Sequence, residues 1–535
     1  MTHPRNIAIP GGKEIPTLLI EHEQKQQWPN GNGSVVEMEF PGHDVIVISD
    51  LHIAEGLHSD GRYTGPENFF YDDALARFLA DPTNTARPTV LVINGDFVDF
   101  LRIIEVPFDK NGIPIMAQMQ QWSTLLTTIG WGGDASPAAL RGSVSRRQRK
   151  LGLGTSAPQS AWKLWLANHG HQLLFQSLAS WLARGNQIVI TKGNHDLEWY
   201  WPEVRNTLRL ILAEHIAANN NNPSSIAQAL QQVVLGRLHF IDDALLIEGS
   251  LYIEHGHRYD RNARVIGPPT LPMKKVEPEL NIPFGSFFNR YLLNRIERLH
   301  PFMDNVRPTQ NVIPTILREN FWLGIKIIFW HIPLLFRLIR GRYYKAYLRA
   351  LANYVFRRLI WQAAAVFGPV IIAAILACEN WRNQFLYWIG ITTTLSSGAG
   401  DAIISPGVGD VIIRFFLSAY ASYLLGQMVS NIQLMGIDSM TDDEGVQALR
   451  RRYPIVTMGH THNPDQIIEA NGHAFFNTGT WIPIVQANSA ELRVDRTFTF
   501  LRCVRNPAGG LVADGLHCWN DDARRPDNQT VLHRE

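Results

Sequence analysis

The stretch Asp44-Val-Ile-Val-Ile-Ser-Asp50-Leu-His52 joins a short apolar run to two polar side chains that follow it directly. Its β-branched residues favour a strand, and the run is too short for a helix of ordinary length. Apolar side chains at successive positions are typical of a strand that is buried on both faces in a layered α/β protein. The stretch therefore predicts a buried strand that ends in functional side chains.

The same arrangement occurs four more times along the chain. The apolar runs 89–94, 187–191, 251–254 and 454–458 each break into a short polar loop. The polar groups after the five runs are Asp50 and His52; Asp96 and Asp99; Asn194, His195 and Asp196; His255 and His257; and His460 and His462. Because side chains that follow the carboxyl ends of parallel strands meet in one crevice, we expect these groups to converge.

Carboxylate and imidazole groups dominate this set, and together they are typical ligands of transition metals. Such mixed ligands suit Mn, Fe or Zn better than Mg, which prefers oxygen ligands alone. The candidate ligands are Asp50, His52, Asp96, Asn194, His255, His460 and His462. These are more groups than one ion needs, so we expect two divalent ions, with Mn favoured and Fe, Zn or Ni as alternatives.

Five motifs in the order D-x-H, G-D-x-x-D, G-N-H-D, H-G-H and G-H-x-H resemble those of the calcineurin-like metallophosphoesterases. The resemblance covers roughly 44–260 and 454–481 and implies a layered β-sandwich flanked by helices. It implies that Asp50, His52 and His462 hold one metal, that Asp96 bridges both, and that Asn194, His255 and His460 complete the second. A hydroxide between the two cations would then attack the phosphoryl group in line, without a covalent intermediate.

The resemblance also implies a role for His195, which would not be a metal ligand. It would lie beside the phosphate and stabilise developing charge or protonate the leaving oxygen, with Asp196 as its orienting partner. We expect Asp99 to be a structural group or to contact a metal-binding side chain, rather than to bind metal itself. We leave the role of His257 open.

Within the family, three runs look most like the UDP-2,3-diacylglucosamine pyrophosphohydrolase group: 49–52, 255–260 and 477–481. In that group a helical lid between the H-G and G-H-x-H motifs holds the acyl chains of a lipid substrate. Here an insertion falls at the same place but is far larger. We therefore expect a first catalytic part at 1–260, an α-helical insertion at 261–441 and a second catalytic part at 442–535.

The insertion is rich in apolar residues. Leu359–Cys378 and Phe415–Ile437 carry no charge and are long enough to cross a hydrocarbon core of about 30 Å. The basic segment Arg337–Arg358 favours the cytoplasmic side, beside anionic headgroups, and Phe321–Phe336 fits an interfacial helix. We expect attachment to the cytoplasmic face of a membrane. The alternatives are a soluble cytoplasmic lid or dimer surface, and an anchor that does not span the bilayer.

Other segments carry weaker patterns. We expect an edge hairpin in the first forty residues, helices at 72–79 and 160–183, and closing strands at 475–481 and 496–502. Residues 101–159 are Gly-rich and basic, and we expect an elaborated loop there. Its cluster Arg146–Lys150 is expected to be solvated or, as the alternative, to contact an anionic substrate.

Composition excludes several classes of protein. Hydrophobic residues make up 45% of the 535 residues and charged residues 18%, which excludes bulk disorder. The 49 Lys and Arg nearly balance the 48 Asp and Glu, so no nucleic-acid polymer is expected as a partner. Three cysteines cannot form a disulfide framework, and the N-terminal residues show no secretory signal, so export by that route is not expected.

These observations predict a dinuclear metal-dependent hydrolase of phosphoester or pyrophosphate bonds. Its expected substrate is an amphiphilic phosphate ester or nucleotide-lipid. The alternative is a phosphodiesterase or phosphatase that acts on a soluble nucleotide or a phosphoprotein, with the insertion serving as anchor or dimer surface. A non-enzymatic membrane scaffold would have no need of the complete ligand set.

Overall fold

The computed structural model describes residues 14–25, 34–57, 61–63, 66–219, 225–272, 277–294, 306–307, 322, 439–486, 491–493, 498–519 and 529–531. The chain divides into two compact units, the first formed by Met1–Val312 with Met435–Glu535 and the second by Ile313–Leu434. Of the second unit only Trp322 is among the described residues. The predicted insertion bounds of 261–441 stay a prediction.

A seven-stranded mixed sheet contains the strand that the first apolar run forms. Its order is β18 (Gln529–Val531), β17 (Leu511–Trp519), β16 (Thr499–Arg505), β2 (Asp44–Ile48), β3 (Thr89–Asn94), β4 (Gln187–Thr191) and β5 (Leu238–Ile241). Strands β2 to β5 pair in parallel, whereas β16 pairs antiparallel with both β2 and β17. The carboxyl ends of β2, β3 and β4 therefore lie at one edge of the sheet.

A six-stranded mixed sheet contains the remaining two apolar runs. Its order is β1 (Val35–Met38), β6 (Ala244–Ile247), β7 (Leu251–Glu254), β11 (Ile455–Met458), β13 (Ala474–Asn477) and β12 (Asp465–Ile468). Strand β11 pairs in parallel with β7 and β13. The pairing of β7 with β11 thus joins segments that lie on either side of the insertion in the sequence.

The two sheets pack face to face. Alternate residues of each strand point to opposite faces, so each strand contributes to a cluster on either side of its sheet. Val45 and Val47 of β2 share one buried cluster with Leu251 and Ile253 of β7. The residues between them on β2, such as Ile46, belong to a second cluster on the other face of the sheet. The short β-branched runs are apolar throughout because both of their faces are buried.

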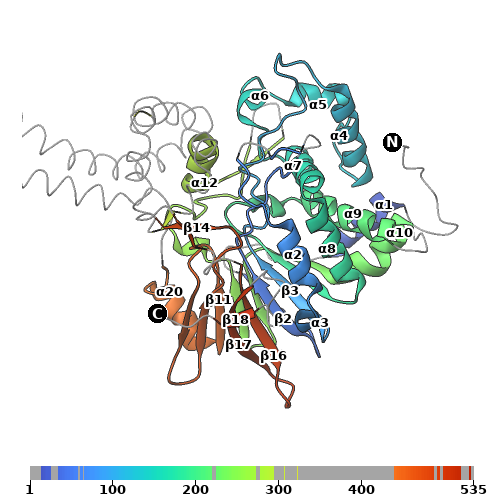
Figure 1. Ribbon diagram of the computed structural model, residues 1–535. Helices are drawn as coiled ribbons and strands as arrows, with labels where there is room; N and C mark the ends of the chain where they lie inside the picture. The colour runs from blue at the N-terminus through green and yellow to red at the C-terminus, as the bar shows by residue number, and fades with distance from the viewer. Residues whose placement is uncertain are drawn as a thin grey trace, which may run out of the picture. The chain divides into compact units, whose positions relative to one another are not determined.

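Helices cover the outer faces of the sandwich (Figure 1). The outer face of the seven-stranded sheet packs on α1 (Ile15–Lys25), α2 (Asp72–Ala80), α4 (Met116–Thr128), α7 (Ala157–Gly170), α8 (Gln172–Ala183) and α9 (Pro202–Asn219). On the six-stranded sheet, Val446 of α20 (Glu444–Arg452) packs with Tyr252 and Val456. The prediction of an α/β fold with sheets flanked by helices is confirmed at this level.

Shorter elements complete the described chain. They are α3 (Pro82–Thr85), α5 (Pro137–Ser143), α6 (Gln148–Leu151), α10 (Ile226–Ala229), α11 (Leu235–Arg237), α12 (Phe284–Phe288), η1 (Leu197–Tyr200), η2 (Leu230–Val234), η3 (His257–Tyr259) and η4 (Asn289–Leu293). Two small sheets pair β8 (Thr270–Leu271) with β9 (Glu279–Leu280), and β10 (Val306–Arg307) and β15 (Glu491–Arg493) with β14 (Ile484–Gln486).

Two predictions of local structure were wrong. The N-terminal segment forms helix α1 followed by strand β1, not a hairpin, because Leu18 and Leu19 of the helix are buried in the core. The expected loop at 101–159 contains α4, whose Met119 and Trp122 are buried on one face. The helical stretch expected at 160–183 is confirmed: it lies within two helices, α7 and α8, which are separated at His171.

The imidazole of His171, at the point between the two helices, joins a buried network. Its Nδ1 lies 2.9 Å from an Asp72 oxygen and its Nε2 lies 3.2 Å from Glu67 Oε2. Glu67 Oε2 also accepts hydrogen bonds from the backbone of Ala54 and Gly56, in the loop that follows His52. Burial disfavours the imidazolium, but Glu67 and Asp72 outweigh it and raise the pKa of His171 to about 10. The network thus anchors a loop of the candidate site.

In the part of the chain that the structure describes, no helix is long and apolar enough to cross a membrane. The predicted spans Leu359–Cys378 and Phe415–Ile437, the basic segment Arg337–Arg358 and, apart from Trp322, the predicted interfacial helix Phe321–Phe336 lie outside the described residues.

Replacing His171 with Gln should lower the free energy of unfolding by about 3 kcal/mol near pH 6, because it leaves the Glu67 carboxylate buried without its cation. The pKa of His171 is raised in the folded chain, so its contribution is fully present below the unfolded value of about 6.5. The contribution disappears as the pH rises through about 10. The difference in melting temperature between wild type and variant should therefore shrink from neutral to alkaline pH. The exposed neighbour His169→Gln serves as control, and a difference independent of pH would show that packing alone is lost.

Candidate metal centre

Loops at the carboxyl ends of five strands bring the candidate ligands together. Asp50 and His52 follow β2, Asp96 follows β3, Asn194 and His195 follow β4, His255 follows β7, and His460 and His462 follow β11. Three of the loops therefore come from the seven-stranded sheet and two from the six-stranded sheet. The centre lies where the edges of the two sheets meet, and it requires residues from both sides of the insertion.

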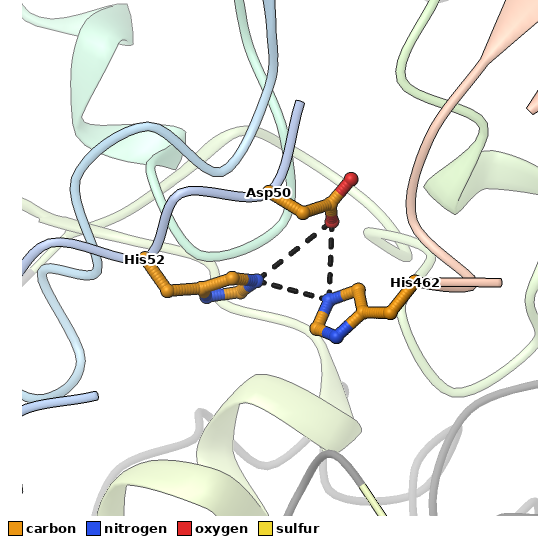
Figure 2. Close-up of side chains that lie close together, drawn as sticks. All are labelled: Asp50, His52 and His462. Atoms are coloured by element: carbon orange, nitrogen blue, oxygen red, sulfur yellow. Dashed lines mark hydrogen bonds and ion pairs between the residues drawn. The ribbon is translucent and has the colours of Figure 1, made fainter. Parts of the chain in front are cut away.

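The first cluster consists of Asp50, His52 and His462 (Figure 2). Asp50 Oδ1 lies 3.1 Å from His462 Nε2 and 3.7 Å from His52 Nε2. The two imidazole Nε2 atoms lie 3.0 Å apart. All three side chains are buried, and a carboxylate oxygen and two ring nitrogens point at one another. A cation at their centre satisfies all three groups at once.

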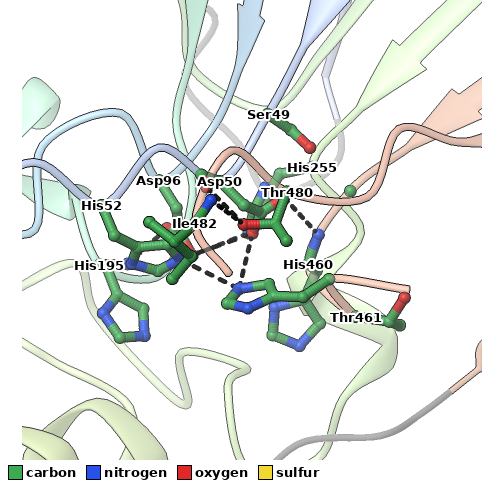
Figure 3. A network of polar contacts seen from close by, with 12 residues as sticks. Ser49, Asp50, His52, Asp96, His195, His255, His460, Thr461, Thr480 and Ile482 are labelled. Carbon is green, nitrogen blue, oxygen red and sulfur yellow. Dashed lines mark hydrogen bonds and ion pairs between the residues drawn. The ribbon is translucent and has the colours of Figure 1, made fainter. Parts of the chain in front are cut away.

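The second cluster consists of Asp96, His255 and His460 (Figure 3). Asp96 Oδ2 lies 3.2 Å from His255 Nε2 and 3.7 Å from His52 Nε2 of the first cluster. The same oxygen is therefore within reach of both clusters. His52 and Asp96 also form a third group with His195. The buried His and Asp groups of these clusters could therefore hold a metal ion.

Hydrogen bonds fix which nitrogen of each imidazole is available to a cation. His255 Nδ1 donates to the backbone carbonyl of Asn94 at 2.9 Å, because a carbonyl can only accept. His52 Nδ1 lies 3.3 Å from the Asp99 carboxylate, and His460 Nε2 lies 3.2 Å from that of Asp260. Each ring therefore directs its other nitrogen toward the clusters, which is the arrangement that ligating histidines adopt in metal sites.

Three buried atoms of the predicted metal ligands lack a hydrogen bond of acceptable geometry. They are Asp50 Oδ1, Asn194 Oδ1 and His255 Nε2. Buried polar atoms in folded proteins are almost always satisfied, and each exception needs an explanation. These three belong to residues predicted to bind metal, so a bound cation accounts for all of them. The donor set therefore fits divalent metal ions.

The electrostatics of the clusters also favour added positive charge. Burial alone would raise the pKa of Asp50, but His255 and His462 outweigh it, and the pKa lies well below the ordinary range. Burial alone would lower the pKa of His255, but Asp96 and Asp50 raise it to about 9. The carboxylates thus stay ionised and attract either protons or metal ions to the same place.

The backbone of the ligand loops is strained in a consistent way. Asp50, His52, Asp96, His460 and His462 all have φ between 51° and 69°, in the left-handed region. Among the described residues, only Glu248 and Phe498 are other non-glycine residues with positive φ. Such conformations cost free energy and cluster at functional sites, where the surrounding structure imposes them. In these backbone conformations the five side chains converge on the same part of the structure.

Two glycines of the motifs are required by close approach. A Cβ atom on Gly193 would lie 2.2 Å from Asp96 Oδ1, and one on Gly459 would lie 2.5 Å from Asp50 Oδ2. The motifs G-N-H-D and G-H-x-H therefore begin with glycine because a ligand carboxylate of another loop packs against it.

His195 is oriented by Asp99, which corrects the prediction that Asp196 does so. His195 Nδ1 lies 2.8 Å from Asp99 Oδ2, and its backbone N–H donates to Asp96 Oδ1 at 2.7 Å. Asp196 instead accepts hydrogen bonds from the backbone of Gly193 and Phe97 and from the indole of Trp199. Asp196 therefore holds the loop, and it does not touch the His195 ring.

Asp99 contacts two histidines of the site at once. Its Oδ2 lies 3.3 Å from His52 Nδ1, and Arg102 Nε donates to the same oxygen at 2.8 Å. Burial raises the pKa of Asp99, but His195, His52 and Arg102 outweigh burial and hold the pKa well below its usual range. Burial lowers the pKa of His195, but Asp99 and Asp96 raise it overall. His195 is thus favoured in its protonated form.

His257 lies beside the centre but outside the three clusters. Its ring centroid is 5.5 Å from that of His255, and its buried Nδ1 has no hydrogen bond. Burial together with His255 and His460 holds the pKa of His257 well below its ordinary value, so this ring is neutral. The structure places it as a neighbour of the ligands.

Two contacts of the centre were not foreseen from the sequence. Asp260 closes the run His255-Gly-His-Arg-Tyr-Asp260, and its carboxylate faces His460. Ser286 of α12 donates to the backbone carbonyl of Asn194 at 2.9 Å. The position of Asp260 at the end of a motif was the available signal. Nothing in the sequence around Ser286 marks it.

No protein-family model matches the chain, and no curated protein matches it. The resemblance to metallophosphoesterases therefore depends on the five motifs, and the case for a metal centre depends on the geometry described above.

Replacing Asp260 with Asn should weaken binding of one metal ion by about 10- to 100-fold, because the carboxylate no longer fixes the ring nitrogen that His460 directs to the cluster. The second ion should bind as before. Titration calorimetry with Mn²⁺ or Zn²⁺ and metal content after dialysis measure both effects, and Asp73→Asn, at an exposed position of α2, is the matched control. Unchanged affinity at both sites, in a variant that unfolds at the wild-type temperature, would contradict this role for Asp260.

Proposed function

We propose that the chain is a dinuclear metal-dependent hydrolase of phosphoester or pyrophosphate bonds with a calcineurin-like metallophosphoesterase fold. The observation that carries the proposal is the convergence of two buried His and Asp clusters with one carboxylate, Asp96, in reach of both. The packing of two mixed sheets with helices on their outer faces supports the proposed fold.

We assign Asp50, His52 and His462 to the first ion, Asn194, His255 and His460 to the second, and Asp96 to both. Two divalent cations, Mn²⁺ being the first candidate and Fe, Zn or Ni the alternatives, would supply Lewis acidity and lower the pKa of a water for attack on phosphorus. Asp96 would lower the repulsion between two such charges, because its carboxylate is within reach of both clusters. Its loss should therefore disrupt both sites.

His195 is the candidate general acid. Asp99 holds its Nδ1 at 2.8 Å and favours the protonated ring, which leaves Nε2 to donate a proton to the leaving oxygen. The side chain of His195 is 12% exposed, whereas Asp99 is fully buried. A substrate can thus reach the ring while the carboxylate that positions it stays out of water.

For the substrate we propose an amphiphilic phosphate ester or nucleotide-lipid, since the insertion falls where the resembling group carries its lipid-holding lid. Phosphodiester or phosphomonoester hydrolysis on a soluble nucleotide or phosphoprotein is the alternative. A scaffold without catalysis has no use for strained ligand loops, whose backbone conformations cost free energy.

Replacing His195 with Asn should lower kcat by about 100- to 10,000-fold on substrates with an alkyl alcohol as leaving group. Such a leaving group must take up a proton as it departs, and the variant has lost the proton donor. The loss should be much smaller with a p-nitrophenyl ester, whose leaving group needs no proton. Metal content should be unchanged in this variant and should fall in Asp96→Asn. His473→Gln, at the amino end of β13, is the control. Equal losses on both substrates would contradict the role of proton donor.

We further infer that the protein works at the cytoplasmic face of a membrane, to which the apolar stretches Leu359–Cys378 and Phe415–Ile437 attach it. An alkaline carbonate wash of membranes from expressing cells tests this inference. The full chain should stay in the pellet, because embedded helices resist the wash. Release of monodisperse protein without detergent would instead support the alternative of a soluble lid or dimer surface.

A further inference from the structure

A rigid turn between β3 and α4 presents apolar side chains to solvent. Ile113, Ile115 and Met116 have exposed fractions of 60%, 36% and 62%. Asp109 Oδ1 accepts hydrogen bonds from the backbone N–H groups of Asn111 and Ile113, which fixes the turn. Phe108 and Pro114 form a bridge at its base. The three apolar side chains are therefore held outside the core by a defined backbone conformation.

Basic side chains lie next to this turn. Arg149 Nη1 donates to the Gly112 carbonyl at 3.2 Å, and its guanidinium lies 4.3 Å from the Phe108 ring centroid. Around this fixed arginine, Arg146, Arg147 and Lys150 are exposed. The contacts of Arg149 place these cations beside the turn.

The charge of this region departs from that of the whole chain. Residues 105–150 contain six basic residues (Lys110, Arg141, Arg146, Arg147, Arg149, Lys150) and three acidic ones (Glu105, Asp109, Asp134), a net charge of +3. The entire chain has a formal net charge of +1. Positive charge is therefore concentrated around the exposed apolar turn.

We propose that this surface, the apolar turn 109–116 together with the basic segment 145–150, docks on an anionic lipid bilayer. A few apolar side chains at a protruding turn can enter the headgroup region, while neighbouring Lys and Arg contact lipid phosphates. A nucleic-acid partner fits less well, because the exposed side chains are aliphatic and offer no aromatic surface on which bases stack. The inference does not depend on the chemistry of the metal centre.

The docking surface is connected to the candidate site through one continuous segment. The chain passes from Asp99 of the centre to the turn, and on this path Glu55 Oε1 accepts hydrogen bonds from the backbone of Ile104 and Glu105. Helices α5 and α6 lie at the opposite end of the first unit from the hairpin of β16 and β17 (Figure 1). Docking by this surface brings the carboxyl-end edge of the sheets toward the lipid.

The test places an environment-sensitive fluorophore on the full chain at Met116→Cys, in a background with Cys378→Ser. Cys503 and Cys518 are buried and should not react. Adding vesicles of phosphatidylcholine with about one-third phosphatidylglycerol should shift the emission to the blue, whereas phosphatidylcholine alone should shift it little. The probe reports on the turn itself, so an anchor elsewhere in the chain does not produce the shift.

Matched variants separate charge from general membrane association. Neutralising Arg146, Arg147 and Lys150 to Gln should weaken the vesicle response on the order of 100-fold, and salt should weaken it in the wild type. Controls are a probe at Ile468→Cys, which is 72% exposed on β12, and neutralisation of the exposed Arg451 and Arg452. An equal shift at both probe positions would overturn the proposal. So would a shift at position 116 that depends on protein concentration without vesicles, because that result indicates self-association.

Discussion

The structure depends on the convergence of five strand ends on one small, buried volume. Carboxylate oxygens and imidazole nitrogens point at one another there, and each group alone would be destabilised by burial. Five of the ligand residues also adopt left-handed backbone conformations, at a cost of about 1–3 kcal/mol each. A cation bound among these groups would offset the costs by satisfying the donor atoms together. The buried clusters of the sandwich hold the loops in these conformations.

Asp99 connects the two kinds of chemistry in the centre. One carboxylate contacts His52, a candidate metal ligand, and His195, a candidate proton donor. Both imidazoles are thus oriented by the same buried negative charge, which Arg102 steadies from the other side. A change in the position of one histidine is thereby coupled to the position of the other. Such coupling keeps the candidate proton donor and the candidate metal ligand in a constant relation.

Much of the framework was predictable because its signals are local. The run 187–191 forms β4 within the expected bounds, since a buried strand is apolar on both faces. The convergence of side chains after these strands could be predicted because strand ends of one direction share an edge. Helix α4 was missed because its apolar side chains lie within a Gly-rich, basic context. The choice between Asp99 and Asp196 as partner of His195 depends on side-chain direction, which neighbouring positions in a motif do not reveal.

The candidate centre joins Asp50 to His462, residues that lie on either side of the insertion. During synthesis the ribosome completes His255 well before His460, with a delay on the order of ten to forty seconds at ordinary elongation rates. Throughout that interval the nascent chain holds only part of the ligand set, and strand β7 lacks its partner β11. The complete set of candidate ligands is therefore assembled only after the chain has been synthesised past His462.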